Sequence, residues 1–110
     1  MHRVVCAIDC GMTVNPGIIR RQVQSAVIYG LSAALRGEIT LKNGRIEQKN
    51  FDDYPVVRIN EAPPIDVHIV TSSENPSGVG EPGTPPLAPA LANALFVLTG
   101  KRARKLPLKA

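Results

Sequence analysis

The chain has 110 residues, a formal net charge of +4 and 44% apolar residues, so it can form one domain, or part of one, with a modest core. Aromatic residues make up only 4% and tryptophan is missing, so the core must be aliphatic. There is no secretory leader pattern at the start and no apolar run long enough to cross a bilayer. We therefore expect no membrane span.

The first predicted element is a buried strand over residues 3–9, a short apolar run with β-branched residues. Asp9 is expected to cap the turn that follows at Gly11. On a strand, Cys6 and Cys10 would lie ~13 Å apart at about 3.3 Å per residue, too far for a disulfide. Without further cysteines or clustered histidines a zinc site is not favoured, and both cysteines are interpreted as small buried hydrophobes.

A helix is predicted to begin at Asn15-Pro16, with asparagine as N-cap and proline at the first helical position, and to stop near Gly37. One apolar stripe runs along it at i+4 spacing: Ile19, Val23, Val27, Leu31 and Leu35. A second line begins at Gln22 and continues with small residues that let another segment approach closely: Ala26, Gly30 and Ala33. From pattern alone, Gln22 is a solvated or locally bonded side chain.

The dipeptide Asn43-Gly44 is the strongest short hairpin signal, because a type I′ turn needs positive φ at both central residues. It predicts a hairpin over residues 38–48 in which Leu41 faces Ile46. Residues 51–55 are predicted to form a turn, and the two adjacent aspartates within it are interpreted as solvated.

Residues 61–64 are predicted to be a linker, and residues 65–70 then alternate as a half-buried strand does. The isoleucines and the valine at the odd positions of this strand should face the core. His68 lies on the other face and is interpreted as exposed or paired with an aspartate.

A glycine- and proline-rich loop at residues 77–86 carries a single carboxylate, Glu81. Glycines on both sides let a ligand come close, while prolines keep the rest of the loop stiff. A lone acid on such a loop is a candidate general base, because burial raises the pKa of a carboxyl towards working pH. The alternative is a tight turn with an exposed glutamate.

Residues 86–98 are apolar on all sides and predict a buried helix, with Asn93 as its one polar side chain and Gly100 as its end. Its N-terminus follows Glu81, and helix N-termini favour anions. Taken together, the elements predict an α+β fold, with two main helices packed on a small mixed or antiparallel sheet and one β-hairpin.

These motifs resemble the molybdenum hydroxylases of the xanthine dehydrogenase and aldehyde oxidase family. The likeness is nearest to the large subunits of bacterial isoquinoline 1-oxidoreductase-like and aldehyde dehydrogenase-like members. It covers nearly the whole chain and is carried by Gly-Val-Gly-Glu-Pro-Gly at residues 78–83, the Ala/Leu stretch at 88–94 and the helix of Gln22. In that family the segment is the last part of a much longer subunit. Residues 1–110 are therefore expected to be a single C-terminal piece, a fragment of a larger molybdopterin-binding domain.

The resemblance implies roles for individual residues. Glu81 matches the catalytic glutamate, which acts as general base in the hydroxylation of an aldehyde or an N-heterocycle. Gln22 matches a glutamine that hydrogen-bonds the pterin, although Gln24 and Ser25 stand where many relatives have Glu-Gly. Three loop residues are expected to contact the same cofactor: Gly78, Val79 and Gly80. The implied cofactor is molybdopterin in its cytosine dinucleotide form with molybdenum, bound only in the complete enzyme.

The implied partners are the remainder of the large subunit, an iron–sulfur subunit and a small-molecule substrate. A competing interpretation is a non-catalytic α+β module that self-associates through an exposed apolar surface, so the isolated chain is expected to be a homo-oligomer. Nucleic-acid binding through the five basic residues within 101–109 is not favoured, because no aromatic residue is interleaved for base stacking. The substrate stays open, as does the compartment, cytoplasm or periplasm.

Overall fold

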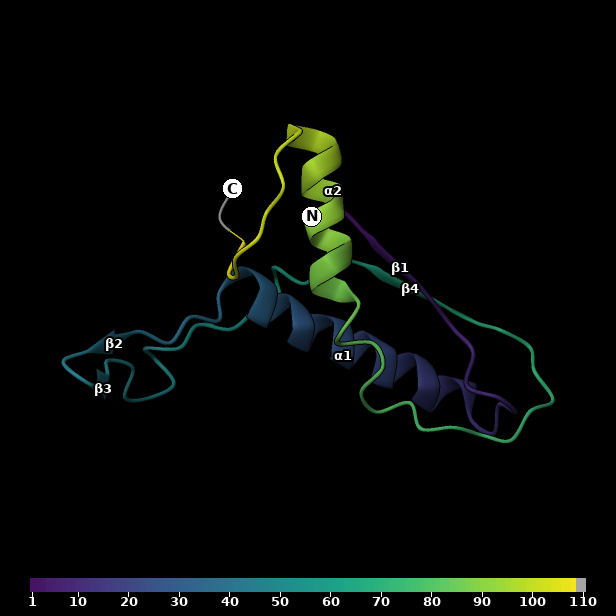
Figure 1. Cartoon of the computed structure of the whole chain (residues 1–110). Helices are drawn as coiled ribbons and strands as arrows, with labels where there is room; N and C mark the ends of the chain where they lie inside the picture. The colour runs from purple at the N-terminus through teal and green to yellow at the C-terminus, as the bar shows by residue number, and fades with distance from the viewer. Residues whose placement is uncertain (109–110) are drawn as a thin grey trace.

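The computed structural model describes residues 1–108 and contains two helices, one parallel strand pair and a separate hairpin (Figure 1). Its elements in chain order are β1 (Val4–Ile8), α1 (Pro16–Leu35), β2 (Leu41–Lys42), β3 (Arg45–Ile46), β4 (Ile65–Ile69) and α2 (Leu87–Thr99). The predicted α+β class with two main helices is confirmed. The sheet differs in one detail, since β1 and β4 pair in parallel while only the hairpin is antiparallel. Parallel neighbours need a long crossover, and α1 lies within it.

Both ends of α1 lie close to where the sequence predicts them. The Asn15 side chain accepts a hydrogen bond from the Ile18 N–H at 3.0 Å, with proline at the first helical position. At the other end, the N–H groups of Arg36 and Gly37 both donate to the Ser32 carbonyl at 3.0 Å. Local capping bonds therefore set the length of this helix.

The core is aliphatic, as the composition predicts. It is centred on one side of α1 and the first residue of α2: Val23, Val27, Leu31 and Leu87. The inner face of the β1–β4 pair covers it with half-buried side chains, and Asp66 on the outer face pairs with Arg3 at 3.1 Å. Both cysteines are free, Cys10 being buried and Cys6 half-buried, while the last residue of the predicted stripe, Leu35, is exposed.

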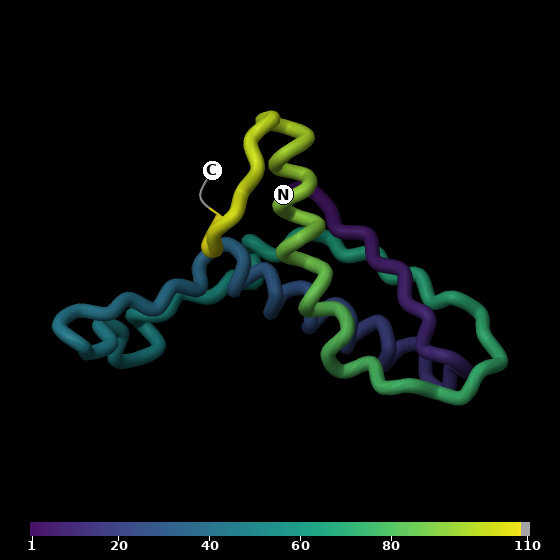
Figure 2. The backbone as a smooth tube through the Cα atoms, viewed as in Figure 1, coloured from purple at the N-terminus to yellow at the C-terminus, as the bar shows by residue number. Residues whose placement is uncertain are grey.

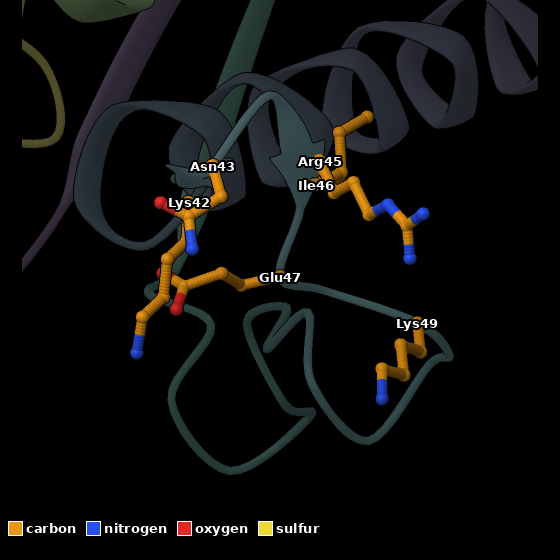
Figure 3. Close-up of a pocket in the computed structure, with 6 residues that line it drawn as sticks. All are labelled: Lys42, Asn43, Arg45, Ile46, Glu47 and Lys49. Atoms are coloured by element: carbon orange, nitrogen blue, oxygen red, sulfur yellow. The ribbon is translucent and has the colours of Figure 1, made fainter.

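The hairpin projects away from the helices (Figures 1 and 2). Asn43 and Gly44 have φ values of 50° and 74°, and Leu41 pairs with Ile46, as predicted. Basic side chains border an open hollow of about 680 Å³ beside it (Figure 3). In that view the charged ends of Lys42, Arg45 and Lys49 lie apart from one another, so they do not converge on one anion.

The prediction that the second helix is buried is wrong. Val97 and Leu98 of α2 are 85% and 81% exposed, and only Leu87 is buried. A helix is buried only where other elements lie against it, and α2 stands away from α1 beyond its first turns (Figures 1 and 2). The Cα radius of gyration is 16.4 Å, whereas a compact domain of this length has about 13 Å. Within residues 1–108, neither helix combines the length and hydrophobicity of a membrane span.

The basic segment after α2 folds back onto α1 (Figure 1). Gly100, with φ 69°, ends α2 as predicted, and the Arg102 guanidinium lies 4.1 Å from the centroid of the Phe96 ring. Further on, the Leu108 N–H donates to the Ala34 carbonyl at 2.7 Å. Lys109, one of the five basic residues considered for nucleic-acid binding, lies outside the described residues.

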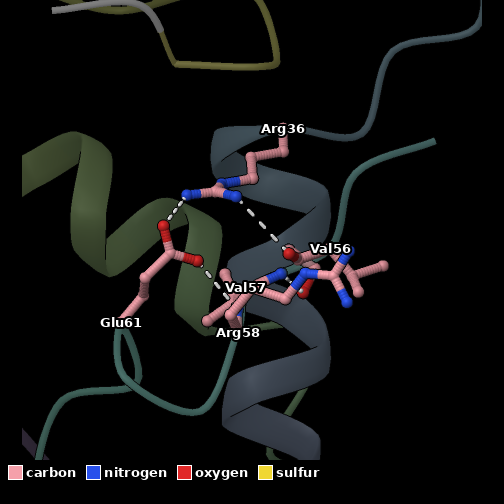
Figure 4. A network of polar contacts seen from close by, with 6 residues as sticks. Arg36, Val56, Val57, Arg58 and Glu61 are labelled. Carbon is pink, nitrogen blue, oxygen red and sulfur yellow. Dashed lines mark hydrogen bonds and ion pairs between the residues drawn. The ribbon is translucent and has the colours of Figure 1, made fainter. Parts of the chain in front are cut away.

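An acid-sensitive contact ties the segment after the hairpin to the end of α1 (Figure 4). The Arg58 N–H donates to Glu61 at 2.8 Å, and the Arg36 guanidinium pairs with the same carboxylate. Arg36 also donates to the Val56 carbonyl at 3.4 Å. The Arg58 backbone N–H, followed by the Arg36 guanidinium, holds the pKa of Glu61 below its ordinary value of 4.5.

We expect Glu61→Gln to destabilise the chain at neutral pH more than in acid. Because the folded-state pKa of Glu61 is lowered, its stabilising contribution is complete above the unfolded-state pKa and is lost as the pH falls through the folded-state pKa. Urea unfolding at pH 7 and at stepwise lower pH below 4.5 measures this. The gap between wild type and Glu61→Gln should shrink with acid, whereas Glu74→Gln, on an exposed loop, should track the wild type. A difference in the free energy of unfolding that stays constant with pH would contradict the lowered pKa of Glu61.

Candidate functional site

Glu81 lies on the long connection between β4 and α2, and its side chain is exposed in this chain. The loop is fixed before and after it by main-chain bonds. The Ser77 N–H donates to the Cys10 carbonyl at 2.9 Å, and the Thr84 N–H donates to the Glu81 carbonyl at 2.9 Å. Glu81 therefore opens a tight turn over residues 81–84 that leads directly into α2.

The turn rests on the line of small residues of α1. Gly83 is buried, and a Cβ placed there would lie 2.9 Å from the Ala26 Cβ and 3.3 Å from the Val23 carbonyl oxygen. The Thr84 hydroxyl donates to the Ala26 carbonyl at 3.3 Å. A Cβ on Gly30 would lie 3.0 Å from the Thr84 carbonyl oxygen. The prediction that another segment closely approaches this face of α1 is confirmed, and that segment is the Glu81 turn.

Gln22 is exposed on α1, one residue before Val23, whose backbone contacts Gly83. The fold thus brings the segments of Gln22 and Glu81 together. The Gln22 side chain has no hydrogen-bond partner among residues 1–108. Gln24 instead donates from Nε2 to the Ile65 carbonyl at 3.3 Å, joining α1 to β4. The sequence placed Gln22 on the line of small residues, but it gave no sign that Gln24 would bond to β4.

The loop glycines next to Glu81 are not explained by packing within the chain. A Cβ on Gly78 or Gly80 would meet no atom within 4 Å, and neither glycine has a left-handed backbone. Across residues 1–108, the N–H groups of residues 78–81 find no acceptor. Small residues with free N–H donors suit the close approach of a ligand rich in hydrogen-bond acceptors.

A hollow of about 210 Å³ lies beside this loop, between it and the first turn of α1. Its walls are mainly apolar and include Ile18, Ile19 and Val79. Between residues 1 and 108, no three His, Cys, Asp or Glu side chains gather as ligands for a metal ion. The chemistry that the described site offers therefore lies in one exposed carboxylate, one exposed amide and a row of main-chain N–H groups.

The chain is similar to one protein family and to several characterised proteins. The sequence profile of the molybdopterin cofactor-binding domain family matches residues 1–63. The beta subunit of isoquinoline 1-oxidoreductase from Brevundimonas diminuta is 37% identical over 109 residues, which is 99% of this chain and 14% of that protein. One of the subunits of nicotinate dehydrogenase from Pseudomonas putida is 38% identical over 109 residues, covering 98% of this chain and 9% of the relative. The chain thus spans about a seventh or less of these relatives.

Two solved structures share the fold. CO dehydrogenase from Oligotropha carboxidovorans superimposes with a TM-score of 0.79 at 22% identity, covering 92% of this chain and 14% of that one. Quinoline 2-oxidoreductase from Pseudomonas putida 86 gives a TM-score of 0.76 at 18% identity, with coverage of 94% and 14%. At these identities the likeness concerns the fold alone.

Proposed function

Because this chain belongs to the molybdopterin cofactor-binding domain family, we propose that it forms part of a molybdenum-dependent oxidoreductase that hydroxylates an aldehyde or an N-heterocycle. The resemblance to the xanthine dehydrogenase and aldehyde oxidase family is confirmed at the level of the family. The observation that carries the proposal is the Glu81 turn seated on α1, preceded by loop residues whose small size and free N–H groups the chain itself does not use.

In this proposal Glu81 is the general base. Its carboxylate accepts a proton from the hydroxyl group that attacks the substrate, which requires an oxygen within about 2.6–3.2 Å of that proton's donor. When bound, the molybdenum cofactor supplies the oxidation and oxygen transfer of the hydroxylation. Because the Glu81 side chain is exposed here, the remainder of the enzyme must cover it to exclude water from the site.

The cofactor is proposed to be held from two sides. The Gln22 amide hydrogen-bonds the pterin from α1, and the main chain of Gly78, Val79 and Gly80 donates to it from the loop. Without side chains, Gly78 and Gly80 allow this approach, and the cytosine dinucleotide form is the proposed version of the cofactor. The free donors and open space at both glycines support this arrangement.

The proposed partners are the remainder of the molybdopterin-binding subunit and an iron–sulfur subunit. The exposed apolar face of α2 and the open shape of the chain support docking onto a larger polypeptide. The same exposed face also favours the alternative, a non-catalytic module that self-associates when isolated. Co-purification with a larger chain and molybdenum separates the two.

We expect Gln22→Ala to weaken cofactor retention in the assembled enzyme while leaving folding intact. A lost neutral hydrogen bond, at about 1 kcal/mol, corresponds to a loss of affinity of about fivefold. Molybdenum per chain after gel filtration measures retention, and thermal unfolding measures stability. Gln24→Ala is the matched control, because Gln24 joins α1 to β4 and should lower stability without lowering molybdenum content. Unchanged molybdenum with a lower unfolding temperature in Gln22→Ala would contradict the assignment.

A further inference from the structure

We infer that Gly83 and Thr84, seated on Ala26 and Gly30 of α1, are the positioning residues that fix Glu81. The inference rests on the proposed role of Glu81 as general base. A general base works only when held close to its reaction geometry, and a misplacement of about 1 Å can lower the rate by about 10²-fold. Some part of the chain must therefore hold the backbone of Glu81 in place.

The two glycines just before Glu81 do not provide this support. Gly78 and Gly80 have open space around them, and their N–H groups donate to no acceptor within residues 1–108. The nearest main-chain bond on that side is from Ser77 to Cys10. The main-chain bond and the close backbone packing nearest to Glu81 therefore come from the residues that follow it.

Gly83 supplies the first part of that support through its small size. Ala26, 5% exposed, and Val23, fully buried, form the surface beneath it. A Cβ at position 83 would lie 2.9 Å from the Ala26 Cβ, closer than such atoms approach, and 3.3 Å from the Val23 carbonyl oxygen. Neither atom belongs to the end of a flexible side chain, so a larger residue at position 83 must push the turn off α1.

Thr84 supplies the second part by bonding in three directions. Its N–H closes the turn onto the Glu81 carbonyl at 2.9 Å, and its hydroxyl donates to the Ala26 carbonyl at 3.3 Å. Its own carbonyl accepts from the Leu87 N–H at 3.4 Å and lies where a Cβ on Gly30 would come within 3.0 Å. Since Leu87 is part of the buried core, Thr84 connects Glu81 to that core.

The test measures backbone order at Glu81 by ¹⁵N relaxation in the 110-residue chain without cofactor. In the wild type we expect an order parameter of about 0.85, and in Gly83→Ala a fall below about 0.6. The double variant Gly83→Ala with Ala26→Gly restores the missing space and should restore the order at Glu81. Gly78→Ala adds the same methyl group to the same loop where nothing lies within 4 Å, so it should leave Glu81 unchanged.

The threonine hydroxyl gives a second, independent comparison. Thr84→Val removes the bond to Ala26 at nearly constant size and should lower the order parameter of Glu81, whereas Thr84→Ser keeps the hydroxyl and should retain it. If Gly83→Ala does not fold, the comparison of Thr84→Val with Thr84→Ser decides whether the contacts on α1 order Glu81. A mobile Glu81 in the wild type, no response to Gly83→Ala, or no rescue by Ala26→Gly would overturn the inference.

In the complete enzyme, Gly83→Ala should lower kcat by about 10²-fold with little change in KM, and the double variant should recover it. Relaxation in the isolated chain tests, without molybdenum, whether Gly83 and Thr84 hold the backbone of Glu81 in place. Turnover of a Glu81 variant in the complete enzyme tests whether Glu81 is the general base. The positioning role of Gly83 and Thr84 and the general-base role of Glu81 can therefore be disproved independently of each other. If Gly83→Ala lowers the order of the Glu81 backbone but leaves kcat unchanged, the positioning role of Gly83 in catalysis is overturned, while the general-base role of Glu81 is not.

Discussion

Replacing Glu81 by glutamine is expected to lower kcat of the complete enzyme by about 10²- to 10⁴-fold, the usual contribution of a general base. The amide has the shape of the carboxylate but cannot accept the proton. The proposed contacts to the cofactor are the Gln22 amide and main-chain groups of residues 78–80, and the Thr84 N–H bonds the main chain of residue 81. Molybdenum should therefore stay bound, and kcat should fall without loss of metal.

The control for this experiment is Glu74→Gln, the same chemical change on the same long connection. Glu74 acts there through its main chain, its carbonyl accepting from the Met12 N–H at 2.8 Å. Steady-state kinetics together with molybdenum per chain should show a loss of kcat in Glu81→Gln alone. Normal turnover in Glu81→Gln would rule out the general-base role, and a loss explained by missing molybdenum would assign Glu81 to cofactor retention.

The exposed face of α2 should be a docking surface for the remainder of the subunit. A groove of about 620 Å³ runs between the start of β1 and α2, with Leu91, Leu95 and Leu98 along its wall. Parallel sheets are normally covered on both faces, yet Val5 on the outer face of the β1–β4 pair is 54% exposed. Apolar surface of this extent needs a covering partner.

We expect Leu98→Lys to weaken docking onto the larger polypeptide by about 30-fold or more, as loss of an interface hot spot of about 2 kcal/mol does. In the isolated chain the same change should shift self-association towards monomer in sedimentation equilibrium. Ile59→Lys makes a similar charge change at a residue that is 96% exposed and does not line this groove, so it should have no effect on either measurement. Equal behaviour of the two variants would contradict a role for this face.

Features governed by local bonds could be predicted from the sequence. Asn15 caps α1, Asn43-Gly44 sets the hairpin register, and Gly100 ends α2, because each depends on residues within a few positions. The parallel pairing of β1 with β4 and the exposure of α2 could not be predicted. They depend on which distant segments meet, and apolar periodicity does not say what covers a face.

In the candidate site, too, contacts between distant residues could not be predicted from the sequence. The likeness to the family singled out Glu81 and Gln22, and the small residues of α1 predicted a close neighbour without identifying it. The bond of Gln24 to Ile65 spans 41 positions, and that of Thr84 to Ala26 spans 58. Contacts at such separations leave no local pattern in the sequence. The packing of Gly83 and Thr84 on α1, which supports Glu81, is therefore seen only in the structure.

The central claim is that this chain works as one piece of a molybdenum-containing assembly. Its most direct test is the intact mass and molybdenum content of the chain purified from its native source under mild conditions. We predict that it arrives bound to a larger polypeptide with molybdenum present. A chain that arrives alone, metal-free and self-associated would contradict the claim and leave the Glu81 turn as a fold element without chemistry.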